Sequence, residues 1–144
     1  MEADKKSLIS VLFEIQNDHK IFRELPPAEL TEKIIGCAFK VSNTLGCGFL
    51  EKVYENSLAY ELRRAGFQVS QQRKIDVFYD GVVVGFYESD IIVDGCIIIE
   101  VKALSALTDA HKAQCLNYLK ATGIRLGLLV NFGIPKVEIK RIAL

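Results

Sequence analysis

A chain of 144 residues is long enough to form one domain with its own hydrophobic core, without disulfides or structural metals. Hydrophobic residues make up 50% of the sequence and charged residues 25%, a composition that is typical of folded proteins and excludes a disordered chain. The net charge is zero, which argues only weakly against a nucleic-acid partner, since acidic residues at a metal site would offset a basic rim.

No segment has the pattern expected for membrane insertion or export. The apolar runs fall well short of the roughly 20 residues that span a bilayer, and residues 1–6 are polar, unlike a signal peptide. We therefore expect no membrane association and a cytoplasmic location. The four cysteines and two histidines lack metal-binding spacing, so we expect reduced thiols that pack as small apolar side chains.

Residues 1–24 have the pattern of a polar helix, which Pro26 and Pro27 would end because proline cannot continue a helix. The apolar positions that recur at helical spacing are Leu8, Val11, Leu12 and Ile15. We expect an N-terminal helical extension at residues 1–27 and a single domain at residues 28–144. Nothing in the sequence indicates the role of the extension.

Two further helices are predicted next. The first begins near Thr31 and ends at Gly46, and the second covers residues 50–65 and ends at Gly66. The first has an apolar stripe at helical period, formed by Ile34, Ile35, Ala38, Val41 and Leu45.

Strand patterns follow, and two dipeptides, Asp80-Gly81 and Asp94-Gly95, predict hairpin turns. Strands with helices before and between them indicate an α/β fold with a mixed central sheet flanked by helices. We expect strands at residues 75–79, 82–87, 91–93, 96–101, 126–132 and 137–142, with a helix at 108–121.

The most apolar strand ends in charged residues, which is unusual because unpaired ions are costly in a protein core. Glu100 and Lys102 lie two residues apart and so share one face of this strand. Asp90 precedes them across the Asp94-Gly95 turn. A two-residue turn would put Asp90 on the opposite face from Glu100. We therefore predict a three-residue loop at residues 93–95, with Ile92 opposite Cys96 and Asp90 opposite Ile98, or an equivalent bulge.

Two carboxylates and a lysine on one face suit metal-assisted hydrolysis. Magnesium prefers hard oxygen ligands and needs only one or two carboxylates beside water and substrate phosphate. A bound metal activates water, and a neighbouring lysine can orient that water or stabilise developing negative charge. The alternative interpretation is a structural ion pair at the end of a sheet.

The runs Ser89-Asp90 and Ile99-Glu100-Val101-Lys102-Ala103 resemble the PD-(D/E)xK nuclease superfamily. From about Leu30 onwards the chain is similar to its GxxExxY (GxxExxR) family, whose naming motif matches residues 48–54. A later block of the family matches residues 114–123 and 127–133. The resemblance implies a restriction-endonuclease-like fold and a nuclease that uses Mg²⁺, with Mn²⁺ as a substitute.

Transferred by position, the resemblance implies that Asp90 and Glu100 are metal ligands and that Lys102 is the catalytic lysine. Glu51 would be an accessory acid that reaches the metal, or else a solvated glutamate on a helix face. Gln114 and Tyr118 match an element that helps to place the nucleic-acid strand, although Tyr118 could equally be a core residue. His111, one turn earlier, is expected to be a polar neighbour.

The chain departs from the family at Glu88, where a basic residue is common before the aspartate. This departure keeps open a second interpretation, a catalytically inactive module that binds nucleic acid or protein. A third is that the apolar strands and the N-terminal helix form a homodimer. Nucleic acid is the expected partner, with DNA favoured over RNA and little sequence specificity. The basic side chains Lys140 and Arg141 would contact phosphates or would be solvated on an edge strand.

Overall fold

The computed structural model describes residues 25–144, so the predicted N-terminal helix lies outside the described residues. Within this range, none of the helices is long and apolar enough to cross a membrane. The helices are α3 (Ala28–Leu45), α4 (Glu51–Arg64) and α5 (Asp109–Thr122). The strands are β1 (Val69–Tyr79), β2 (Val82–Val93), β3 (Ile97–Lys102), β4 (Leu126–Asn131) and β5 (Glu138–Ala143).

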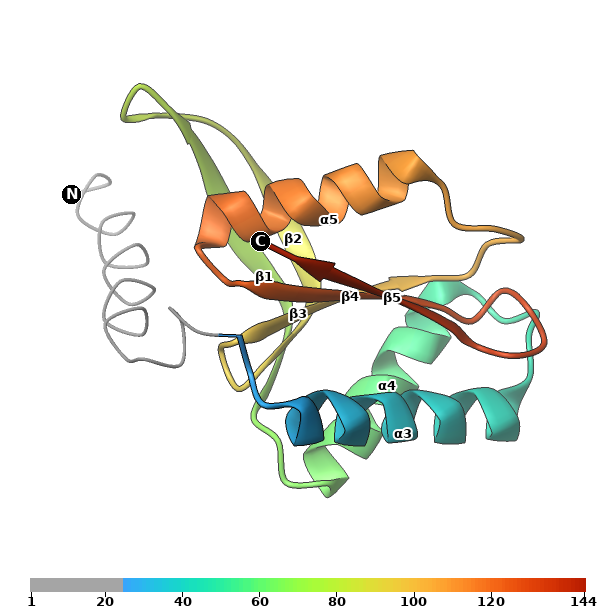
Figure 1. Ribbon diagram of the computed structural model, residues 1–144. Helices are drawn as coiled ribbons and strands as arrows, with labels where there is room; N and C mark the ends of the chain where they lie inside the picture. Colours follow the sequence, from blue (N-terminus) through green and yellow to red (C-terminus); the bar gives the residue numbers. More distant parts are fainter. Residues whose placement is uncertain (1–24) are drawn as a thin grey trace.

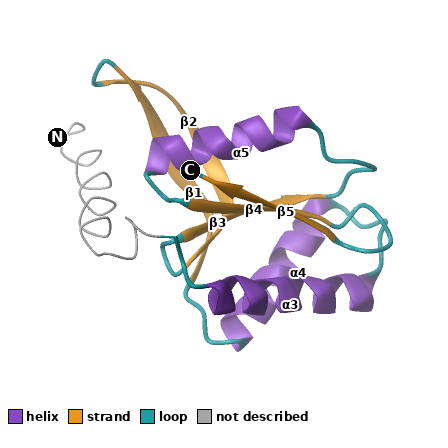
Figure 2. Ribbon diagram, in the orientation of Figure 1, coloured by secondary structure: helices purple, strands orange, loops and turns teal. Residues whose placement is uncertain are grey.

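The five strands form one mixed sheet in the order β1-β2-β3-β4-β5. Neighbouring strands are antiparallel except β3 and β4, which are parallel and are connected through α5. Helix α5 covers one face of the sheet, and α3 and α4 cover the other (Figures 1 and 2). This three-layer arrangement confirms the predicted α/β class and is consistent with a restriction-endonuclease-like fold.

The core follows from the apolar central strands. Almost every residue of β3 and all of β4 are buried, as expected for strands that are covered on both faces. On one face, Tyr54 of α4 stacks on Phe132 with ring centroids 4.8 Å apart. On the other, α5 packs so closely on β4 that a Cβ at Gly127 would lie 2.7 Å from the Cys115 sulfur. The helix positions that face the core include Ile34, Ala38, Val41, Leu58 and Leu62.

The strands at residues 82–87 and 91–93, expected to be separate, form the single strand β2. Pairing with β1 continues from Val82 to Val93, because β1 begins earlier than predicted and provides hydrogen-bonding partners along this length. The Asp80-Gly81 dipeptide forms the predicted two-residue turn, with Tyr79 opposite Val82 and with φ of 52° and 73° at the turn residues. The outer part of this hairpin projects beyond the rest of the sheet (Figure 1).

The second hairpin has the predicted parity but a different register. Val93 pairs with Ile97 and Ile92 with Ile98, so the loop is residues 94–96 and the prediction of a loop at 93–95 was wrong. Asp94 and Gly95 adopt φ of 50° and 66°, and the Cys96 N–H donates to the Val93 carbonyl at 3.0 Å. Asp94 is also held by Gln68, whose N–H donates to its side chain at 2.8 Å. This anchoring of the turn explains why the loop lies one residue later than expected.

Gly133 follows β4, where the chain passes the backbone of Leu104. A Cβ at this position would lie 2.2 Å from the Leu104 backbone, which cannot move without displacing the end of β3. We expect Gly133→Ala to lower the free energy of unfolding by about 1–3 kcal/mol, measured by chemical denaturation.

Gly36→Ala is the matched control for this substitution. Gly36 lies in α3, and a Cβ added there would have nothing within 4 Å, so alanine should raise stability by about 0.5–1 kcal/mol. Equal effects of the two substitutions would contradict the close approach at Gly133.

Candidate active site

The candidate site lies where β2 and β3 separate. Their ladder ends with Ile91 opposite Ile99, after which β2 continues beside β1 while β3 continues beside β4. Continuing this register by one residue places Asp90 opposite Glu100. The two carboxylates therefore lie at the fork of the sheet, the point beyond which β2 and β3 no longer pair with each other.

Glu100 and Lys102 share the face of the sheet that α5 covers, and Asp90 lies beside Glu100 at the fork. Ile98 pairs with Gly127, which faces Cys115 and Leu119 of α5. Residues two and four positions further along β3 point to the same side. The structure thus brings together the three residues that the sequence predicts to form the site.

Asp90 is fixed by the strand it faces. Its Oδ2 accepts a hydrogen bond of 2.8 Å from the Val101 backbone N–H, and its Oδ1 accepts one of 3.3 Å from the Gln72 side chain. The side chain thus provides the acceptor for Val101 N–H just beyond the point where the β2–β3 ladder ends. These two hydrogen bonds hold the carboxylate in place at the fork.

Glu100 is 6% exposed, and among residues 25–144 its Oε1 has no hydrogen-bond partner. The pKa of Glu100 is raised from its ordinary value of 4.5 to about 9, mainly by burial and also by the negative charge of Asp90, while Lys102 opposes the shift. A divalent cation fits this environment, because it would supply a partner for the orphaned oxygen and offset the repulsion between the two carboxylates.

Lys102 is half-buried at the end of β3, and the surrounding backbone is tightly held. Its carbonyl accepts a hydrogen bond of 2.8 Å from Phe132 N–H. Asn131, fully buried and paired with Lys102, accepts from Leu104 N–H at 2.9 Å and donates to Leu104 carbonyl at 3.0 Å. The amide of Asn131 therefore ties the chain after Lys102 to β4.

Glu51, the first residue of α4, is exposed near the carboxylate pair. Although Glu51 is exposed, its partial burial raises its pKa; Lys102 lowers this pKa and Asp90 raises it, so these groups interact across the fork. Within residues 25–144, however, no three His, Cys, Asp or Glu side chains are arranged to hold a metal ion. The site as built is a pair of carboxylates, Asp90 and Glu100, with Glu51 beside it.

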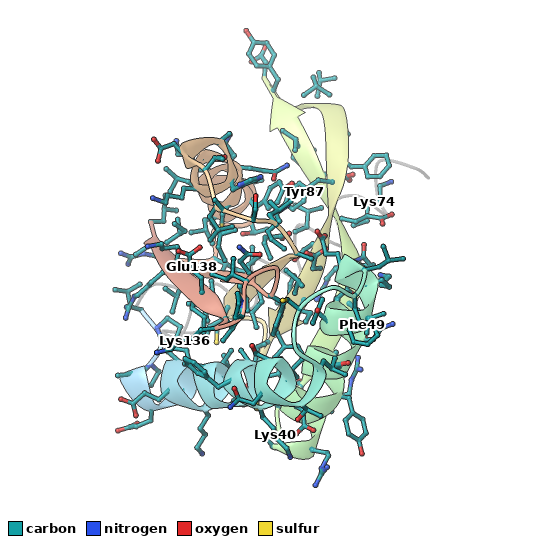
Figure 3. All side chains as sticks on the ribbon, turned by 90° about the vertical axis from the view of Figure 1, so that its right-hand side faces the viewer. Lys40, Phe49, Lys74, Tyr87, Lys136 and Glu138 are labelled. Carbon is teal, nitrogen blue, oxygen red and sulfur yellow. The ribbon has the colours of Figure 1, made fainter. Side chains whose placement is uncertain are left out.

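Gln114 and Tyr118 lie on the side of α5 that faces the site. Burial raises the pKa of Tyr118 to about 12, with further contributions from Glu100 and Asp90, while a hydrogen bond with Gln114 lowers it. The Tyr118 ring stacks on Tyr87 at 3.6 Å, and the Tyr87 hydroxyl donates to the Tyr118 carbonyl at 3.1 Å. Figure 3 shows Tyr87 on the α5 side of the sheet and Phe49 beside the start of α4.

Several other charged residues have structural partners. The Nδ1 of His111 accepts from Thr108 N–H at 3.0 Å and so caps α5, as expected for a polar neighbour. Glu88 is exposed and directly opposite Lys74 in the β1–β2 ladder, and the Lys74 ammonium lies 3.9 Å from the Asp76 carboxylate. Lys140 and Arg141 are exposed on β5, which is an edge strand.

The sequence did not single out Glu55 or Gln72, although both contact the site. Glu55 is 3% exposed on α4, and the Gln72 side chain bridges it to Asp90. The only feature of the sequence that could have indicated Glu55 is its position one helical turn after Glu51. From the sequence alone, such a glutamate is expected to be an ordinary solvated residue.

The raised pKa of Glu100 makes the metal-free site destabilising at neutral pH. The unfolded chain loses this proton near pH 4.5, whereas the folded protein keeps it to about pH 9. Glu100 therefore contributes most to the free energy of unfolding below pH 4.5, where it is protonated in both states. This contribution is lost as the pH rises from 4.5 towards 9.

We expect Glu100→Gln, which cannot ionise, to be more stable than wild type at pH 8 in EDTA by at least about 1 kcal/mol. The difference should shrink towards pH 4 in denaturant titrations, and Mn²⁺ should stabilise only the wild type. A variant less stable than wild type at pH 8 would show that Glu100 is a structural residue.

A family model described as PD-(D/E)XK nuclease superfamily matches residues 28–142. Searches of curated proteins and of solved structures found no match to this chain. The matched segment begins with α3, contains β1 to β4 and ends within β5, so the motif residues lie on the elements that build the fork. On this evidence the chain belongs to the PD-(D/E)XK nuclease superfamily.

Proposed function

We propose that this protein is a divalent-metal-dependent nuclease that hydrolyses phosphodiester bonds at Asp90, Glu100 and Lys102. The observation that carries the proposal is the buried carboxylate of Glu100, which lies beside Asp90 and Lys102 and whose Oε1 has no hydrogen-bond partner among residues 25–144. A structural ion pair is a poorer explanation, because Glu100 is held with a raised pKa in spite of the lysine two residues away.

In this proposal Asp90 and Glu100 hold Mg²⁺, or Mn²⁺ in its place. The bound ion would lower the pKa of a coordinated water and stabilise charge on the phosphate. Two carboxylates suffice for Mg²⁺, which keeps several waters, so the lack of a third acidic ligand in the described part of the chain fits this metal.

Lys102 and the residues around the fork would act on the substrate. The Lys102 ammonium, next to the carboxylates, orients the attacking water or stabilises the negative charge that develops on the phosphate. Glu51 would act as an accessory acid that accepts a hydrogen bond from a water at the site. Gln114 and Tyr118 would help to position the nucleic-acid strand from the α5 side.

The geometry around Glu51 supports assignment to the GxxExxY family. Gly48 has φ of 115°, and Tyr54 is fully buried. The Tyr54 hydroxyl donates to the Gly46 carbonyl at 2.7 Å and accepts from Phe49 N–H at 3.2 Å. The glycine and tyrosine of the motif thus shape the loop that brings Glu51 to the fork.

We further propose DNA as the favoured substrate, with little sequence specificity, because the sequence has no recognisable base-reading motif. Binding would then rest on phosphate contacts and weaken steeply with salt. The exposed apolar side chains of the projecting hairpin support a homodimer, since such surfaces commonly mark protein contacts. They are Val77, Phe78, Tyr79, Val82, Val84 and Phe86.

Cleavage of labelled single- and double-stranded DNA and RNA tests the proposed chemistry. With Mg²⁺ or Mn²⁺ we expect cutting that EDTA stops, that Glu100→Ala abolishes, and that Lys102→Ala slows by about 10²–10³-fold. Lys33→Ala changes an exposed lysine of α3, across the sheet from α5, and should cut like wild type.

If folded wild type cuts none of the four substrates with either metal, the nuclease proposal is wrong. The protein would then be a non-catalytic binding module of the same fold, and unchanged nucleic-acid binding by Lys102→Ala would identify it as such.

A further inference from the structure

Gln72 has an unusual backbone conformation in the middle of β1. Its φ is 52°, in the left-handed region that non-glycine residues rarely adopt, although Gln71 and Arg73 on either side are paired with β2. These two pairs place Gln72 opposite Asp90. Strained residues of this kind persist only where the surrounding structure holds them, and they gather at functional sites.

The strain turns the Gln72 side chain towards α4. In a regular strand consecutive side chains point to opposite faces. Here Gln71 and Gln72 both reach Glu55, with their amide nitrogens 2.8 and 2.7 Å from its two carboxylate oxygens. The left-handed conformation is what allows two consecutive residues to contact one carboxylate.

The Gln72 amide group bridges two carboxylates. Its Nε2 donates to Glu55 Oε1 at 2.7 Å and to Asp90 Oδ1 at 3.3 Å. Only the NH₂ end of a glutamine can donate twice, so both contacts require the same orientation of the amide.

Glu55 is an anchor in this network. It is 3% exposed, and its oxygens accept from Lys52, at 3.1 Å, as well as from the two glutamines. Each carboxylate oxygen of Glu55 therefore has donors within the protein and does not need a metal ion, in contrast to Glu100 Oε1.

We propose that Gln72 is a positioning residue for Asp90, held in place by Glu55, and that it maintains the affinity of the site for its metal ion. The proposal rests on the proposed function. Val101 N–H and the Gln72 amide bind one oxygen of Asp90 each, which fixes the rotation of the carboxylate. Acceptor positions remain on both oxygens for a cation. Partners that orient metal ligands in this way commonly change metal affinity by 10- to 100-fold when removed.

The test is Mn²⁺ binding by isothermal titration calorimetry on the full chain without nucleic acid, together with thermal unfolding in EDTA. Gln72→Gly removes the amide but adopts a positive φ without strain. We expect this variant to bind Mn²⁺ at least about 10-fold more weakly than wild type while its unfolding temperature does not fall.

Gln71→Ala is the matched control, because the Gln71 amide donates to Glu55 and Asn56 rather than to Asp90, and this variant should bind Mn²⁺ like wild type. If Gln72→Gly binds Mn²⁺ as wild type does, or if both variants lose the same affinity, the positioning role is wrong while the proposed metal site stands. If wild type binds no Mn²⁺, the proposed metal site is wrong and the positioning role falls with it.

Discussion

The structure depends on the separation of β2 from β3 after Ile91 and Ile99. Up to that pair, the strands share the apolar interior of one sheet. Beyond it, Asp90 and Glu100 face each other with no further strand pairing between them. A carboxylate in this position is largely removed from water and lies next to a second negative charge, so it keeps its proton or requires a cation. The fork thus favours the binding of a positive charge at the end of an otherwise apolar strand.

The layers on either side of the sheet support this fork in different ways. Helix α5 covers the face that carries the charged residues and brings Tyr118 towards them. Helix α4 lies on the opposite face, with Glu51 at its start and Glu55 one turn later. The bond between Gln72 and Glu55 connects this second layer to Asp90 through the edge of the sheet. The carboxylate pair is therefore held from both layers.

The features of this site that would serve the proposed activity also lower the stability of the folded protein. A buried glutamate oxygen that has no hydrogen-bond partner among residues 25–144, and a glutamine with positive φ, both lower the stability of the metal-free protein. The surrounding core of β3 and β4 tolerates them because it is almost fully buried and continuous. Local departures from folding rules are expected where a protein has been shaped for binding or catalysis.

The sequence by itself determined the α/β class, the positions of the main helices and strands, and the shared face of Glu100 and Lys102, because these follow from local periodicity. It also indicated that Asp90 must join that face through an odd-length loop. Only the tertiary structure decided the register of that loop, since Gln68 anchors Asp94 from a distant part of the chain. Packing of α4 likewise decided the burial of Glu55 and the strained bridge at Gln72, because contacts between separate layers leave no periodic signal in the chain.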